Sequence, residues 1–158
     1  MLAVADEKEL HLLEFQDRPM LSSRIARLCK RHAAVLFHRK NPVIDQLEAE
    51  LGEYFDGMRT RFAVPLDIGG TEHQERVWCG LLEVPYGATW SYQELAEYVG
   101  KPTGVRAVAR AVADNRVAIL VPCHRIVGSD GALTGYAGGI WRKRSLLRVE
   151  GPTDQPAR

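Results

Sequence analysis

The sequence predicts two domains, a small α/β unit over residues 1–70 and a mainly helical unit over residues 71–151, followed by a flexible tail over residues 152–158. Short apolar runs alternate with stretches of helical spacing up to Gly69 and Gly70, and this glycine pair marks a break. Beyond the pair, stretches of helical spacing dominate. The 158 residues, 46% apolar and 26% charged, are ordinary for a globular protein.

The first part of the chain is expected to combine a small sheet with helices. The apolar runs "LHLLEF" (10–15) and "AAVLFHR" (33–39) predict strands. Between them, "MLSSRIARLCKRH" (20–32) predicts a helix because its apolar residues recur near helical spacing. "RFAVPLDI" (61–68) predicts a further strand that runs into the linker.

A second helix is predicted over "NPVIDQLEAELGEYFDG" (41–57). Asn41 can cap it, Pro42 suits its first turn, and Gly57 can end it. One apolar stripe is expected to face the core, formed by Val43, Leu47, Leu51, Tyr54 and Phe55.

The second part opens with capping patterns. Thr71 and Gln74 precede one apolar helical stretch, and Ser91 and Glu94 precede another. A four-residue turn then leads to "GVRAVARAVADN" (104–115), so two short helices follow one another in a helix-turn-helix pattern. A basic helix is predicted over residues 140–150.

The helix over 104–115 carries only Ala and Val on its apolar side, while Arg106 and Arg110 share another face at i, i+4. Small side chains allow close approach to another surface. Two interpretations stay open at this point: a helix that reads nucleic acid, or a tightly packed helix with two solvated arginines.

Charge is distributed unevenly along the chain. Residues 1–100 hold 11 basic and 16 acidic residues, whereas residues 101–151 hold nine basic and three acidic ones. A basic C-terminal third favours a polyanionic partner.

The three cysteines, Cys29, Cys79 and Cys123, are an odd number and form no CxxC pair, which indicates free thiols. Cys29 lies near His32 and His38, but this is a weak zinc signal, and we predict no metal and no cofactor. The N-terminus lacks a signal-peptide pattern and no apolar run is long enough for a membrane helix, so the expected location is cytoplasmic.

Cys123 stands at the end of the apolar run "ILVPC" and directly before His124. An imidazole can favour the reactive thiolate, although neighbours in an extended segment point apart unless a bend or a water connects them. A catalytic imidazole also needs an orienting carboxylate. Among Asp114, Asp130 and Glu150, only Glu150 ends a helix able to pack back on the cysteine.

The segment "PCHRIVGSDGALTGYAGG" (122–139) resembles the active-site signature of the O6-alkylguanine-DNA alkyltransferases, also called methylated-DNA–protein-cysteine methyltransferases. The resemblance extends through "VPYGATWSYQELAEYVGKPTGVRAVARAVADN" (84–115) and on to "LLRVEG" (146–151), and covers residues 71–151. It implies a variable N-terminal α/β domain before a winged helix-turn-helix. It also implies stoichiometric, irreversible DNA repair by transfer of the alkyl group from O6-alkylguanine, with O4-alkylthymine an open second substrate.

The resemblance assigns roles at the reacting thiol. Cys123 would accept the alkyl group, His124 would take its proton through a water, and Glu150 would orient the imidazole. Asn115 would form the hinge between the recognition helix and the active-site segment, with a helix cap as its alternative role. Tyr92 would donate a hydrogen bond to the flipped base.

Further roles concern the base pocket and the DNA. Tyr136 would form a pocket wall, the N–H of Ala137 would bind guanine O6, and Pro122 would shape the approach to the thiol. Arg106 would fill the space left by the flipped base. The partner implied is double-stranded DNA containing O6-alkylguanine, bound by a monomer through the minor groove without sequence preference. Other expected contributors to the DNA surface are Ala107, Arg110, Arg116, Arg125 and Lys143.

Three alternatives remain. A cysteine hydrolase could use Cys123, His124 and Glu150, but Arg106 would then have no role. A lesion-binding protein without repair activity would need no acceptor cysteine. The chain could also be a truncated member of the family, or the C-terminal part of a larger adaptive-response regulator, because it begins partway into the expected first hairpin.

Overall fold

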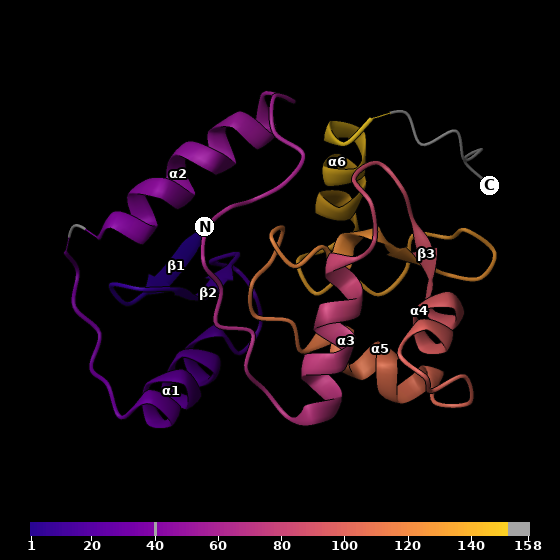
Figure 1. Ribbon diagram of the computed structural model, residues 1–158, viewed down its shortest axis with the longest axis horizontal. Coiled ribbons are helices and arrows are strands. Elements are labelled where there is room, and N and C mark those ends of the chain that lie inside the picture. The colour runs from indigo at the N-terminus through magenta and orange to yellow at the C-terminus, as the bar shows by residue number, and fades with distance from the viewer. Residues whose placement is uncertain (40, 152–158) are drawn as a thin grey trace.

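A computed structural model describes residues 1–39 and 41–151 (Figure 1). In the N-terminal half, a β-hairpin lies between two helices in this view. Its elements are β1 (Leu2–Ala5), β2 (Leu10–Glu14), α1 (Leu21–His32) and α2 (Pro42–Phe55). The C-terminal half is mainly helical, with α3 (Glu72–Leu82), β3 (Trp90–Ser91), α4 (Tyr92–Tyr98), α5 (Val105–Ala113), the 3-10 turn η1 (Cys123–Arg125), β4 (Ile126–Val127) and α6 (Ile140–Val149).

Strand β2 holds the N-terminal half against the rest of the chain. All five of its residues are buried, and it pairs with β1 in antiparallel register. Two isolated parallel bridges extend this pairing, from Leu10 to Leu66 and from Leu13 to Val117. The second bridge reaches the segment that follows α5, so β2 contacts the backbone leading to Cys123.

Two predicted strands are wrong. Residues 33–39 form no strand and are exposed, with Val35 75% and Phe37 79% accessible. Residues 61–68 contribute only the bridge at Leu66. The partner of β2 is instead the short run Leu2–Ala5 at the start of the chain, which the sequence analysis does not predict as a strand because four residues give too short an alternating pattern.

The predicted helices are confirmed within their expected ranges. The Asn41 side chain caps α2 by accepting hydrogen bonds from the N–H groups of Val43 and Ile44. Of the expected apolar stripe, Phe55 is an exception, since it is 49% exposed. Reciprocal capping boxes open the next helices, Thr71 with Gln74 on α3 and Ser91 with Glu94 on α4.

Helices α3, α4 and α5 pack together in the C-terminal half. The Trp78 indole N–H donates to the Ala111 carbonyl at 2.8 Å and ties α3 to α5. Strands β3 and β4 pair in parallel, with Trp90 opposite Ile126. The winged form of the helix-turn-helix stays a prediction.

One apolar core draws on both halves of the chain, with members that include Leu10, Leu47, Leu81, Leu95 and Leu146. The predicted domain boundary at residue 70 is not tested by this packing. Among the described residues, no helix combines the length and apolarity needed to cross a bilayer.

Loss of the α2 cap should be measurable. We expect Asn41→Ala to lower the free energy of unfolding by about 1 kcal/mol, because two helix N–H groups lose their acceptor. Asn41→Ser supplies another capping oxygen and should recover much of the loss. Urea unfolding of the three proteins checks this, and equal losses for Ala and Ser would contradict the capping role.

Candidate active site and exposed face of helix α5

Cys123 begins the turn η1 and is 9% exposed. Its sulfur lies 3.1 Å from Nδ2 of Asn115. A cavity of about 10 Å³ adjoins the thiol, room for about one water molecule. Its walls come from both halves of the chain and are formed by Phe15, Arg18, Val112, Ala113, Ala118, Gly135, Tyr136, Ala137 and Gly138.

His124 is fully buried and held by Glu150. Nε2 of His124 lies 2.7 Å from Oε1 of Glu150. Burial lowers the pKa of His124 although Glu150 opposes the shift, so the imidazole is neutral near pH 7. A neutral ring that donates from Nε2 has its acceptor at Nδ1. Among the described residues this buried Nδ1 atom has no hydrogen-bond partner.

The Glu150 carboxylate accepts hydrogen bonds from several donors besides His124. Arg125 binds it through Nε at 2.8 Å and Nη2 at 3.0 Å, and the Tyr54 hydroxyl donates to Oε1 at 2.7 Å. Burial alone would raise the pKa of Glu150, but the hydrogen bonds from His124 and Arg125 and the positive charge of Arg125 outweigh it and lower the pKa to about 2. Tyr54 and Arg125 are parts of the site that sequence reasoning missed.

Asn115 links the end of α5 to the thiol. Besides the sulfur, its Nδ2 group donates to the Val121 carbonyl at 2.9 Å, and its Oδ1 atom accepts from the Val117 N–H at 2.9 Å. The cap residue of α5 is Asp114, so Asn115 stands just beyond the helix rather than capping it. Its side chain fixes the turn that carries Cys123.

The predicted pocket residues surround the cavity to different degrees. Tyr136 and Ala137 line it, and the Tyr136 hydroxyl has no partner among the described residues. Tyr92 reaches the rim, where its hydroxyl donates to the Gly135 carbonyl at 3.2 Å. Pro122 is buried directly before the thiol and is not one of the wall residues.

The exposed face of α5 carries Arg106, Ala107 and Arg110. Its opposite face, with Val108, is buried. Neither arginine side chain has an ion pair or hydrogen bond to any residue that the structure describes. Both guanidinium groups are therefore available to an external anion.

Three other basic residues expected at the DNA surface are instead engaged in the fold, which corrects that expectation. Arg125 binds Glu150, and Lys143 is fully buried, with Nζ donating to the carbonyls of Ile126 and Thr134. Arg116 is half-buried over the ring of Trp78 and donates to a backbone carbonyl in the linker. Buried cations with backbone partners leave no local signal in the sequence.

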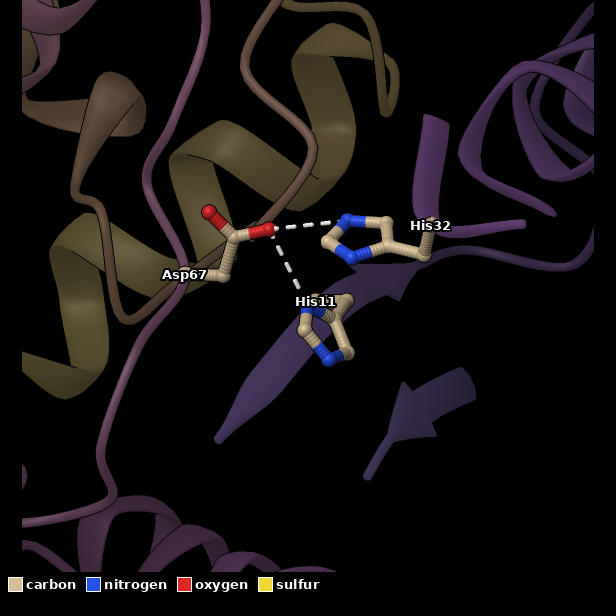
Figure 2. A group of neighbouring side chains, drawn as sticks. All are labelled: His11, His32 and Asp67. Carbon is tan, nitrogen blue, oxygen red and sulfur yellow. Dashed lines mark hydrogen bonds and ion pairs between the residues drawn. The ribbon is translucent and has the colours of Figure 1, made fainter. Parts of the chain in front are cut away.

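A separate cluster of titratable groups ties the hairpin and α1 to the linker (Figure 2). His11 Nδ1 and His32 Nε2 lie 3.0 and 3.2 Å from the same oxygen of Asp67. The guanidinium groups of Arg31 and Arg116 lie 3.6 and 3.7 Å from this carboxylate. These cations already neutralise the carboxylate. Cys29 and His38 are not in the cluster, and the absence of a metal stays a prediction.

Comparison with known proteins identifies the family. The family of the 6-O-methylguanine DNA methyltransferase DNA-binding domain matches residues 72–152. The chain belongs to this family. It is 53% identical over 107 residues to the methylated-DNA–protein-cysteine methyltransferase of Mycobacterium tuberculosis, a match that covers 68% of this chain and 62% of that protein. The match to the inducible methyltransferase of Bacillus subtilis is 42% identical over 121 residues and covers 77% and 68% of the two chains.

A solved structure extends the likeness to both halves of this alkyltransferase-family chain. The crystal structure of Mycobacterium tuberculosis OGT in complex with DNA matches with a TM-score of 0.80 and 37% identity, covering 96% of this chain and 88% of that one. The hairpin, α1 and α2 therefore belong to an architecture that this relative shares.

The lowered pKa of Glu150 makes stability depend on pH. A carboxyl whose folded pKa lies below its unfolded value stabilises the fold above that unfolded value, and the contribution is lost as pH falls from about 4.5 to about 2. We expect Glu150→Gln to lower the free energy of unfolding by about 3 kcal/mol at pH 7, with the difference shrinking toward pH 2.

Urea unfolding of the parent and the variant between pH 2 and pH 7 measures this difference. Glu48→Gln, on the exposed face of α2, is the matched control and should change little. A loss in Glu150→Gln that stays constant with pH would contradict the ionised, partnered state of the carboxylate.

Proposed function

We propose that this chain repairs DNA by moving the alkyl group of O6-alkylguanine directly to Cys123. The observation that carries the proposal is the arrangement around the thiol. A buried sulfur adjoins a small cavity, Asn115 holds it, and the next residue is a neutral histidine fixed by Glu150. The family name points to the same chemistry.

In the proposed step, one water connects the Cys123 thiol to Nδ1 of His124. The thiol proton passes to this nitrogen, and the thiolate attacks the alkyl carbon. A carbon–sulfur bond forms, the carbon–O6 bond breaks, and the electron pair stays on guanine, which then takes up a proton from solvent. The unpartnered, buried Nδ1 atom of His124 supports this relay, because it leaves one acceptor free for a bridging water.

The pocket residues supply hydrogen bonds to the leaving base. We infer that Tyr92 and the N–H of Ala137 stabilise the charge that develops on guanine. The product is a thioether, which water does not readily cleave, so each molecule reacts once. O4-alkylthymine presents a similar alkyl–oxygen bond and is a candidate second substrate.

Access to the thiol requires both the base and the wall to move. A base inside the stack cannot reach a buried sulfur, and extrusion of one nucleotide costs a few kcal/mol. The cavity of about 10 Å³ is also too small for a guanine ring. The wall segment from Gly135 to Gly139 contains three glycines and is the part best suited to move aside.

We propose α5 as the element that meets DNA. Arg106 would occupy the space of the extruded base, while Ala107 allows close approach to the narrow minor groove and Arg110 adds charge. Contacts to phosphate rather than base edges suit a protein that must find damage in any sequence. One chain carries all of these groups, which suits a monomer.

A cysteine hydrolase is the second candidate, since Cys123, His124 and Glu150 also resemble a hydrolytic triad. One observation disfavours it: the arginines on the exposed face of α5, whose side chains have no partner among the described residues, would serve no purpose in a hydrolase. A lesion-binding protein without transfer would not need the buried, partnered thiol.

The direct test is intact-protein mass after incubation with duplex DNA that carries one O6-methylguanine. We expect the gain of one methyl group per chain, located on Cys123 by peptide mapping. Cys123→Ser should bind the damaged duplex and gain nothing. Binding without methyl gain by the parent protein would make this a lesion-recognition protein, and methyl gain by Cys123→Ser would refute the acceptor assignment.

The role of Arg106 is tested by comparing two substrates. Arg106→Ala should slow methyl transfer from duplex DNA by at least about tenfold, because the extruded base is no longer replaced in the stack. Transfer from the free base O6-methylguanine should be unchanged. Arg61→Ala removes the same charge from the exposed linker between α2 and α3 and serves as the control. Equal losses on both substrates would refute a role in flipping.

A further inference from the structure

Two arginines from the N-terminal half meet the C-terminal end of α5. Arg18 donates from Nη2 to the Ala113 carbonyl at 2.7 Å and from Nη1 to the Asn115 carbonyl at 3.4 Å. Arg24 donates to the carbonyls of Ala113, Asp114 and Asn115 at 3.2 to 3.3 Å. Cations at this end of a helix satisfy its free carbonyls and oppose the negative end of its dipole.

A fully buried carboxylate holds this pair of arginines. Both oxygens of Glu14 accept from Nη1 of Arg18, at 2.6 and 2.8 Å, and Nη1 of Arg24 lies 3.6 Å from one of them. The two arginine side chains are 8% and 11% exposed. A buried pair in which one guanidinium nitrogen meets both carboxylate oxygens is held in place more firmly than an exposed ion pair.

The same contact continues to the acceptor thiol. Backbone bonds join Leu13 to the segment after the hinge: its N–H donates to the Arg116 carbonyl at 2.9 Å, and its carbonyl accepts from the Ala118 N–H at 2.8 Å. Asn115, whose carbonyl the arginines hold, donates from Nδ2 toward the sulfur of Cys123. The cluster of Glu14, Arg18 and Arg24, here called the hinge clamp, is therefore linked to the thiol through one intervening residue, Asn115.

Arg18 is also near the thiol itself, since both line the same cavity. Burial raises the pKa of Cys123, the Asn115 hydrogen bond and the Arg18 charge oppose this, and the Glu14 charge adds to it. Other polar or titratable side chains that interact with the thiol come from α4, the wall segment and α6, namely Tyr92, Tyr136 and Lys143.

We propose that Arg18, held by Glu14, is a positioning residue for alkyl transfer to Cys123. It fixes the carbonyl end of α5 and places one positive charge beside the thiol, which favours the thiolate. Glu14 restrains this effect, because its own charge disfavours the thiolate while it anchors the arginine. The inference rests on the proposed function for its biological meaning, but its physical content concerns only the thiol.

The opposite signs of the two charges give a sharp test. Arg18→Gln and Glu14→Gln both break the same ion pair, so a purely structural role predicts similar consequences for both. The proposal predicts opposite ones: the midpoint of thiol ionisation rises in Arg18→Gln and falls in Glu14→Gln, each by on the order of one pH unit. Arg31→Gln is the matched control, since it removes a half-exposed arginine of α1 outside the hinge clamp.

The measurement is the rate of Cys123 alkylation by iodoacetamide as a function of pH, read by mass spectrometry. The variants are made in full-length protein in which Cys29→Ser and Cys79→Ser remove the other thiols. Circular dichroism shows which variants fold. If one hinge-clamp variant does not fold, the direction in which the midpoint of thiol ionisation shifts in the other variant, measured against Arg31→Gln, decides.

Opposite shifts with an unchanged control support the proposal. Shifts in the same direction, unshifted profiles, or an equal shift in Arg31→Gln overturn it. Iodoacetamide needs neither DNA nor base flipping, so this result is independent of the methyl-transfer assay. If the parent protein gained no methyl group while the two variants still showed opposite shifts, the proposed function would be refuted. The role of Arg18 at the thiol would stand.

Discussion

The fold around the active site depends on one buried carboxylate. Taking the charge of Glu150 out of water costs several kcal/mol, and the protein offsets this with donors from three separate parts of the chain. Tyr54 comes from α2, His124 and Arg125 from η1, and the Gly87 N–H approaches at 3.4 Å. Since each donor must be present for the charge to remain buried, the carboxylate fixes the relative positions of these segments.

The segment between Asn115 and the thiol of Cys123 holds backbone strain. Ile119 has φ 72, a left-handed conformation that a β-branched residue rarely adopts and that costs about 1–3 kcal/mol. Backbone bonds on both sides, from Leu120 to Ala118 and from Val121 to Val117, hold the turn in place. Asn115 adds a bond to the Val121 carbonyl. The strain allows a very short connection to bring Cys123 back against the end of α5.

Local features of this chain could be predicted from sequence, and distant pairings could not. The Asn41 cap, the two capping boxes and the helix stripes are set by residues within a few positions of each other, and the structure has them. The partnership of His124 with Glu150 could be predicted because Glu150 ends a helix able to pack back on the cysteine, and because the family resemblance assigns it this role. The burial of Lys143 and of the ion pair between Glu14 and Arg18 depends on tertiary contacts, and a charged side chain in a sequence carries no sign that it is buried.

The tight cavity at Cys123 also determines which reagents the thiol meets. Under the proposed function the sulfur would react once, so an earlier reaction with a peroxide or another electrophile would consume the acceptor. Cys79 is exposed, whereas Cys123 faces a space of about one water molecule and has its ionisation suppressed by burial. The small cavity and the suppressed ionisation therefore shelter Cys123 chemically, because they make its reaction with small electrophiles slower than that of the exposed Cys79 without preventing it.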